Sequence, residues 1–145
     1  SIYNNAAQQI KSLSILDYPP DFDDLKGVSK SGEVYGVEGK SNLLIKIGSK
    51  PRHELITSVY AEKLFYDECL LANKLHHRIP QKTKRCYGIG SAKIGGKYKQ
   101  FRVDDNARGI SLEKYVPKAI KNPDDLHVSI VLEVLEQICT TVLEL

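Results

Sequence analysis

Residues 27–47 read GVSKSGEVYGVEGKSNLLIKI, and this stretch decides the fold expected for the chain. Val34 to Val37 is a short β-prone run, and Leu43 to Ile47 is a nearly continuous apolar one. Residues 38–42 between them form a turn cluster of hairpin length. A glycine-bearing segment, Gly27 to Gly32, precedes the first run. The pattern therefore predicts three antiparallel strands.

The next segment, Pro51 to His77, has the pattern of one long helix. Proline suits a first helical turn. Apolar residues then recur at spacings of three and four, on a face made of Leu64, Leu71, Ala72 and Leu75. Glu68 stands in the middle of this face. Because an unpaired buried charge is too costly to keep, Glu68 is expected to have a partner.

The rest of the chain predicts two strands, two helices and an N-terminal extension. The strands are Arg85 to Ser91 and Tyr98 to Val103, around a turn at residues 94–96, and Ser111 to Val116 begins a short helix. Asn122 caps a longer helix with Pro123 at its first position. That helix is expected to have apolar residues at Leu126, Val131, Val134, Leu135, Ile138, Val142 and Leu145. No helix stop signal follows, which indicates that the sequence is cut within the helix. In the extension, residues 6–13 predict a short helix that residues 17–21, with two prolines, break.

The composition is that of an ordinary globular domain. The 145 residues suffice for one core, and 41% of them are hydrophobic. No run of about 18 apolar residues predicts a membrane span, and the first residues lack the pattern of a signal peptide. Cys69, Cys86 and Cys139 are odd in number and widely spaced, so no disulfide framework or zinc site is expected. Each cysteine is expected to be a small buried hydrophobe in a reducing, intracellular compartment.

The charge is unevenly distributed along the chain. Residues 69–103 carry 9 Lys or Arg and no acid, although the net charge is only +3. The preferred interpretation is a solvated surface. The alternative is a surface that faces an anionic partner such as nucleic acid, with Tyr87 and Tyr98 available to stack on bases.

Three features could carry chemistry, and each has a plain structural alternative. Gly27 and Gly32 let backbone N–H groups approach a phosphate and Val34 can cover a planar base, but an ordinary hairpin turn uses such glycines too. Lys46 interrupts a buried strand, so its ammonium must reach an anion or solvent. Glu68 is either the partner of a cation or a solvated helix residue.

The order of these features resembles the small lobe of the protein-kinase fold. In that family a glycine loop covers the ATP phosphates, a strand lysine contacts the α- and β-phosphates, and a helix glutamate holds the lysine. Leu43-Leu44-Ile45-Lys46 stands where the family has Val-Ala-Ile-Lys. Glu68 is followed by Leu75 and His77, like the family's Glu with Leu seven and His nine residues on.

The resemblance covers residues 26–145. Ile79-Pro80 resembles the link into the fourth strand, Gly109 to Tyr115 resembles the end of the hinge, and Asn122 to Leu145 resembles the helix that leads to the catalytic loop. The resemblance implies an α+β fold. After an N-terminal extension (1–25), a small lobe with a five-stranded antiparallel sheet and one long helix (26–104) precedes the hinge and first helices of a truncated helical C-lobe (105–145).

The function implied is the ATP-binding portion of a protein kinase, of the Ser/Thr type, that transfers the γ-phosphate to a protein hydroxyl. Lys46 and Glu68 would be the catalytic residues. Residues expected to contact the nucleotide are Gly27, Val28, Ser29, Gly32, Val34, Leu44, Lys46, Asp104, Asp105 and Asn106. ATP with Mg²⁺ is the expected cofactor, with metal ligands downstream of the chain. A protein substrate is expected, and neither a membrane nor a nucleic acid is expected as a partner.

Some positions depart from the family pattern. Ser29 replaces the middle glycine of the loop, and the hinge (103–107) is acidic, so the gatekeeper position falls on either Val103 or Asp104. The compact lobe resembles the reduced kinases that bacterial pathogens deliver into the host cytosol as effectors. No His-Arg-Asp or Asp-Phe-Gly segment occurs in the 145 residues, so the chain alone is not expected to be a competent enzyme. The alternatives are a pseudokinase or scaffold and a basic nucleic-acid-binding domain.

Overall fold

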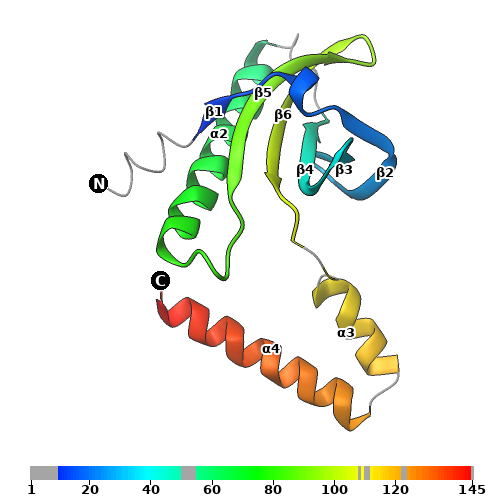
Figure 1. Cartoon of the computed structure of the whole chain (residues 1–145), viewed down its shortest axis with the longest axis vertical. Helices are drawn as coiled ribbons and strands as arrows, with labels where there is room; N and C mark the ends of the chain where they lie inside the picture. Colours follow the sequence, from blue (N-terminus) through cyan, green and yellow to red (C-terminus); the bar gives the residue numbers. More distant parts are fainter. Residues whose placement is uncertain (1–9, 50–54, 108, 110–111, 122–123, 145) are drawn as a thin grey trace. The chain divides into compact units, whose positions relative to one another are not determined.

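The chain has an α+β fold and divides into two compact units, residues 1–107 and 108–145. The computed structural model describes residues 10–49, 55–107, 109, 112–121 and 124–144. Within these ranges the first unit contains a sheet and one long helix, and the second contains two helices (Figure 1). The general α+β class expected from the sequence is confirmed.

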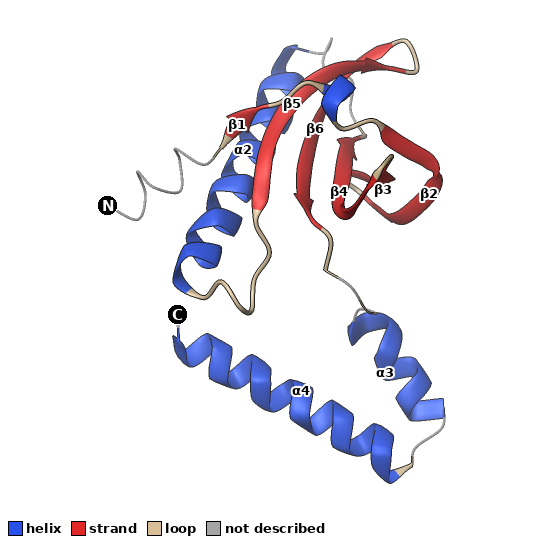
Figure 2. Cartoon of the chain, in the orientation of Figure 1, coloured by secondary structure: helices blue, strands red, loops and turns tan. Residues whose placement is uncertain are grey.

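The first unit is built on a six-stranded mixed sheet (Figure 2). Its elements are β1 (Lys11–Ser12), the 3-10 helix η1 (Ile15–Asp17), β2 (Pro20–Ser29), β3 (Gly32–Val37), β4 (Lys40–Gly48), α2 (Leu55–Arg78), β5 (Cys86–Ile94) and β6 (Lys97–Asp105). The strand order is β1-β5-β6-β4-β3-β2. Strands β2 to β6 pair antiparallel with their neighbours, and β1 pairs parallel with β5.

The short strand β1 makes the sheet six-stranded rather than five-stranded. Lys11 and Ser12 belong to the segment for which the sequence predicted a helix, and residues 6–9 of that segment lie outside the described residues. Both residues instead pair with Gly88 and Ile89 of β5. A sheet edge offers a row of backbone donors and acceptors that outweighs a weak local preference for helix.

The hairpin between β2 and β3 is tight, with its turn at Lys30 and Ser31. A Cβ atom on Gly32 would lie 2.1 Å from the carbonyl oxygen of Ile47 in β4, so only glycine fits there. Ser49 fixes the tip from the other side, because its hydroxyl donates to the Lys30 carbonyl at 3.0 Å. The glycine segment is therefore a short turn held against the end of β4.

One face of the sheet carries the hydrophobic core. The buried core residues are Val37, Leu43, Ile45, Ile47, Ala92, Phe101 and Val103, with Leu13, Ile15 and Tyr18 from the N-terminal segment packed against them. Side chains alternate between faces along a strand, so Arg102 and Asp104 of β6 point to the opposite face. Arg102 contacts Glu68 of α2, which places α2 on that opposite face.

The buried stripe of α2 differs from the predicted one by about one position. Phe65, Cys69 and Asn73 are buried at four-residue spacing, whereas Leu71 is 58% exposed. The other members of the predicted face, Glu68 included, are half-buried beside this stripe. A polar residue, Asn73, occupies a core position because its amide bonds the backbone of β5. The predicted helix start at Pro51 lies outside the described residues.

The prediction that no disulfide forms is wrong. Cys69 of α2 and Cys86 of β5 form a disulfide. Both side chains are buried, and this burial was expected from the sequence. Cys139 is a free cysteine and is exposed, contrary to the expectation for it. The linked residues are 17 apart in sequence, so only the packing of α2 on β5 brings them together.

The second unit consists of α3 (Leu112–Lys121) and α4 (Asp125–Glu144). The two helices contact each other through Tyr115 and His127, with Tyr115 Oη and His127 Nδ1 2.9 Å apart. Asp124 caps α4, because its carboxylate accepts from the His127 N–H at 2.8 Å. The predicted cap, Asn122, and the following Pro123 lie outside the described residues. By length and composition alone α4 is a candidate membrane span, and none of it is buried.

Candidate functional site

The strand register gathers several of the predicted site residues into one row across the sheet. Gly27 of β2 lies opposite Val34 of β3, Val34 lies opposite Lys46 of β4, and Lys46 lies opposite Arg102 of β6. In the next row Leu44 lies opposite Asp104. Directly opposed residues point to the same side of a sheet. We call the side chains of Val34, Leu44, Lys46, Arg102 and Asp104 the polar face.

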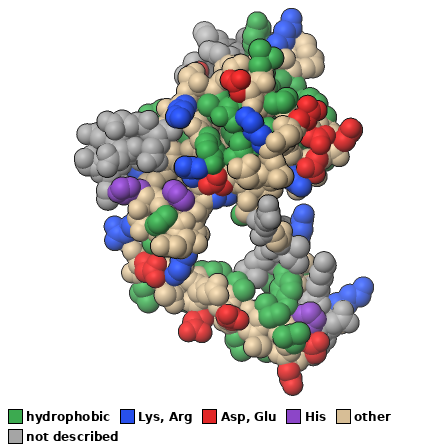
Figure 3. Space-filling view, viewed as in Figure 1, with side chains coloured by type: hydrophobic (Ala, Val, Ile, Leu, Met, Phe, Trp, Pro, Cys, Tyr) green, Lys and Arg blue, Asp and Glu red, His purple; other side chains and the backbone are tan. Residues whose placement is uncertain are grey.

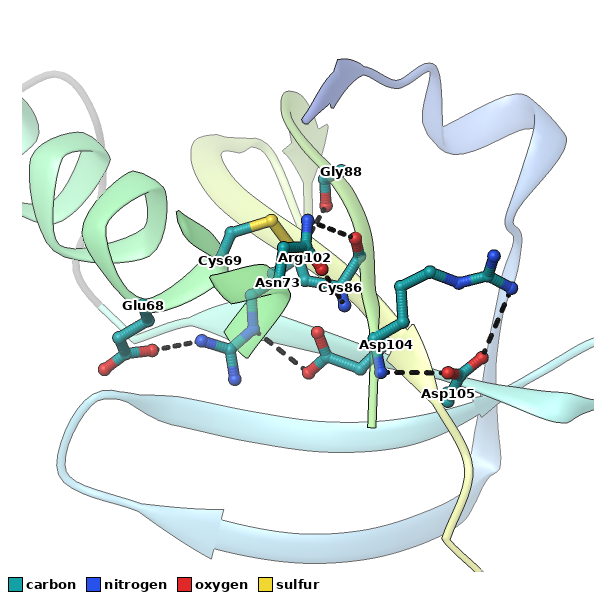
Figure 4. Close-up of a disulfide and its surroundings, with 9 residues drawn as sticks. Glu68, Cys69, Asn73, Cys86, Gly88, Arg102, Asp104 and Asp105 are labelled. Atoms are coloured by element: carbon teal, nitrogen blue, oxygen red, sulfur yellow. Dashed lines mark hydrogen bonds and ion pairs between the residues drawn. A yellow bond between two sulfur atoms is a disulfide. The ribbon is translucent and has the colours of Figure 1, made fainter. Parts of the chain in front are cut away.

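Glu68 has a cationic partner, as expected, but this partner is Arg102. The Arg102 guanidinium donates from one terminal nitrogen to Glu68, and its Nε donates to Asp104 Oδ2 at 3.0 Å (Figure 4). The side chains of Arg102 and Asp104 are only 16% and 11% exposed, and that of Glu68 is 35% exposed. One guanidinium therefore links α2 to the polar face through two carboxylates.

Lys46 lies beside this network. Its Nζ is 5.8 Å from the centroid of the Phe65 ring, and the Arg102 guanidinium carbon is at the same distance from that ring. Two cations thus lie near one buried aromatic ring, an arrangement that the ring's negative face favours. Among the described residues, the ion pair of Glu68 is made with Arg102 and not with Lys46.

Asp104 is the buried acid of the polar face. Burial raises the pKa of the Asp104 carboxyl, and the positive charges of Arg102, Lys84 and Lys46 oppose that rise. The net effect is a raised pKa, so the cost of removing the carboxylate from water exceeds the attraction of its cationic neighbours. The three cations lie close enough to this carboxylate to stabilise its charged form, so the polar face holds charges of both signs.

The other predicted hinge residues have structural partners. Asp105 Oδ2 accepts from the Arg85 N–H at 2.9 Å, and the Arg85 guanidinium lies 4.0 Å from the same carboxylate. Asn106 Nδ2 donates to the Ser41 carbonyl at 3.0 Å. These contacts tie the end of β6 to Arg85 and to Ser41. Of the predicted hinge residues, Asp104 is the one whose carboxylate belongs to the polar face.

The predicted phosphate loop lies at the tip of the β2–β3 hairpin. Val28 is 70% exposed, and the Ser29 hydroxyl donates to the Gly32 carbonyl at 3.3 Å. An added Cβ at Gly27 meets nothing within 4 Å, in contrast to Gly32. Of the loop residues, Gly27 is the one that lies in the same row across the sheet as Lys46, because it pairs with Val34 and Val34 pairs with Lys46.

Two cavities lie away from Lys46 and Glu68. One of about 730 Å³ is lined by the end of α2, the loop 80–84 and residues 105–107. The other, of about 510 Å³, is lined by residues 10–13, by Glu62 and Tyr66 of α2, and by β5 and Gln100. Neither is lined by a residue of the polar face.

Sequence reasoning missed Arg102 because it resembles the other basic residues of its stretch. The signal that could have found it is the alternation of Phe101 and Val103 with Arg102 and Asp104, which places an opposite-charge pair on one side of a strand.

A comparison of the sequence with protein-family models gives no match, and a comparison with curated proteins gives no significant match.

Proposed function

We propose that the chain binds ATP with Mg²⁺ on the polar face, as the nucleotide-binding part of a protein kinase. The observation that carries this proposal is the row Gly27–Val34–Lys46–Arg102, with Leu44 in the next row. A glycine, apolar side chains and the Lys46 ammonium on adjacent strands combine room for phosphates, a surface for a base and compensating charge, while Arg102 is paired with Glu68 and Asp104.

In the proposed complex Lys46 contacts the α- and β-phosphates, and Leu44 and Val34 cover the adenine ring. Positioning and charge stabilisation supply most of the catalysis in phosphoryl transfer. Mg²⁺ would supply neutralisation of the phosphate charge, and the transfer to a protein Ser or Thr would require a base and metal ligands in addition to the residues described above.

We also propose that strands β2 to β6 with α2 correspond to the kinase small lobe predicted for residues 26–104. The support is the mutual antiparallel pairing of these strands and the position of α2 between β4 and β5 in the chain. The intracellular setting, and delivery into a host cell, remain predictions from the sequence.

The test is calorimetric titration of the chain with Mg-ATP. The variants are Lys46→Met and the matched control Lys40→Met, which changes a lysine on the same strand whose Nζ donates to the Asp17 carbonyl. Wild type and Lys40→Met should bind. Lys46→Met should bind at least about tenfold more weakly, the loss of one charged hydrogen bond. Equal binding by a folded Lys46→Met variant would remove Lys46 from the site.

A binding-only role, as a pseudokinase or scaffold, is the second candidate. It is favoured by the pairing of Glu68 with Arg102 instead of Lys46. Phosphate incorporation into protein substrates by the full-length protein separates the two roles: nucleotide binding without incorporation supports the scaffold.

The nucleic-acid alternative has less support. Arg85 and Arg102, two cations of the acid-free stretch, are engaged by Asp105, Glu68 and Asp104. On the face shown in Figure 3, Lys and Arg side chains are interspersed with apolar and acidic ones rather than gathered in one patch. Retention of RNA or DNA by the chain, with a steep salt dependence, would favour nucleic-acid binding instead.

A further inference from the structure

Cys86 is held to α2 by three bonds to two residues that lie one helical turn apart. The disulfide joins it to Cys69, and the side chain of Asn73, one turn further on, bonds its backbone in both directions (Figure 4). Asn73 Nδ2 donates to the Cys86 carbonyl at 3.0 Å, and the Cys86 N–H donates to Asn73 Oδ1 at 2.9 Å. One bond of the three is covalent and can be broken by reduction.

This attachment is part of a closed ring of contacts that includes the polar face. Glu68 precedes Cys69 in α2, and Cys86 lies opposite Asp104 in the β5–β6 pairing. Arg102 bonds both Glu68 and Asp104. The disulfide thus fixes α2 at the level where Glu68 meets Arg102.

We infer that the Cys69–Cys86 disulfide is a redox latch that holds Glu68 on Arg102, and that its reduction lets Glu68 exchange Arg102 for Lys46. The second half of this inference rests on the proposed nucleotide site. Arg102 and Lys46 lie opposite each other on neighbouring strands, so the exchange needs a shift of about one strand spacing, roughly 4.8 Å. The two hydrogen bonds of Asn73 keep α2 docked after reduction.

The chemistry is thiol–disulfide exchange with a dithiol reductant. A reductant thiolate attacks one cysteine sulfur, the Cys69–Cys86 bond breaks, and the released thiolate takes up a proton. The second thiol of the reductant then attacks the mixed disulfide and frees the other cysteine. The protein gains two electrons and two protons, and the reductant becomes a disulfide. Because Cys69 and Cys86 are 0% and 1% exposed, the exchange requires a transient local opening of α2 from β5, after which the Asn73 hydrogen bonds form again.

Hydrogen exchange tests the latch without any nucleotide. The probe is the chain with Cys139→Ser, which removes the exposed free cysteine, measured oxidised and after treatment with dithiothreitol. Amides of residues 62–78 should exchange faster in the reduced chain, while those of β3 and β4 keep their protection. Equal exchange in α2 would overturn the latch, and so would loss of protection throughout the sheet. The variant Cys69→Ala/Cys86→Ala should reproduce the reduced pattern without any reductant.

A second arm measures Mg-ATP affinity in both states. Allosteric couplings are typically 5- to 150-fold, so the reduced chain should bind more tightly by a factor of about that size. Equal affinity in the two states, with different exchange in α2, would overturn the link between the disulfide and Glu68. Absence of binding in both states would overturn the proposed function and this link, while the exchange experiment still decides whether the latch on α2 exists.

Discussion

The choice of partner by Glu68 can be measured with two double-mutant cycles in the nucleotide-free chain. The first combines Arg102→Met with Glu68→Gln, and the second combines Lys46→Met with Glu68→Gln. The structure gives Glu68 an ion pair with Arg102, so the first cycle should show a coupling energy and the second should not. Methionine retains part of the apolar stem of each cation, and glutamine keeps the shape of the glutamate.

The size of the coupling follows from the exposure of the two side chains. A hydrogen bond to a charged group contributes about 1.5–3 kcal/mol when buried, and exposed ion pairs contribute about 0.2–1 kcal/mol. Arg102 is 16% exposed and Glu68 is 35% exposed, so the pair lies between these limits. We expect about 1–1.5 kcal/mol for Arg102 with Glu68, and less than about 0.5 kcal/mol, the usual error of additivity, for Lys46 with Glu68.

The assay is urea unfolding of wild type, the single variants and the double variants at neutral pH. Equal m-values across the set would show that the comparison is between free energies of unfolding and not between different denatured states. A larger coupling for Lys46 with Glu68 than for Arg102 with Glu68 would refute the arrangement described above. It would also remove the starting state from which the redox latch was inferred.

Three further changes test other parts of the structure. Cys69→Ala with Cys86→Ala should lower the free energy of unfolding by about 3 kcal/mol, the contribution of a disulfide that closes a loop of similar length, measured without reductant. The pKa of Asp104 is raised by burial, so the folded chain binds that proton more tightly than the unfolded one. The contribution of Asp104 to stability should fall as the pH rises above about 4, where an unfolded Asp loses its proton, so the stability of Asp104→Asn relative to wild type should rise in urea unfolding between pH 4 and 7. Gly32→Ala should cost about 1–3 kcal/mol in thermal unfolding because its Cβ would meet a backbone oxygen at 2.1 Å, whereas Gly27→Ala should stay within about 0.5 kcal/mol.

Local patterns in the sequence predicted β3 to β6 and the long helix, whereas β2 begins at Pro20 rather than in the predicted segment Gly27 to Gly32. The runs around Val34 and Leu43 gave β3 and β4, and the spacing of apolar residues gave α2 with an error of about one position in its buried face. Strand β1 was not predicted, because a two-residue strand has no periodicity of its own and exists only where β5 offers an edge. Its formation depends on tertiary pairing.

The candidate site was predictable only in part. Alternation along β4 placed Leu44 and Lys46 on one face, and the register then brought Arg102 opposite Lys46. The partner of Glu68 could not be read from the chain, because Arg102 is 34 residues away and stands among other basic residues. The bond between Cys69 and Cys86 also depends on the docking of α2. Charge pairing and disulfides between distant segments are consequences of packing.

Chemical-shift mapping with Mg-ATP tests nucleotide binding on the polar face most directly. Backbone amides of the isotope-labelled chain are followed at nucleotide concentrations up to several-fold above 1 mM, roughly the upper end of typical KM values. The proposal predicts saturable shifts at Gly27, Val34, Leu44 and Lys46, the residues that the register of β2, β3 and β4 brings together. Absence of any shift over this range, or shifts confined to the loop 80–84, would contradict it.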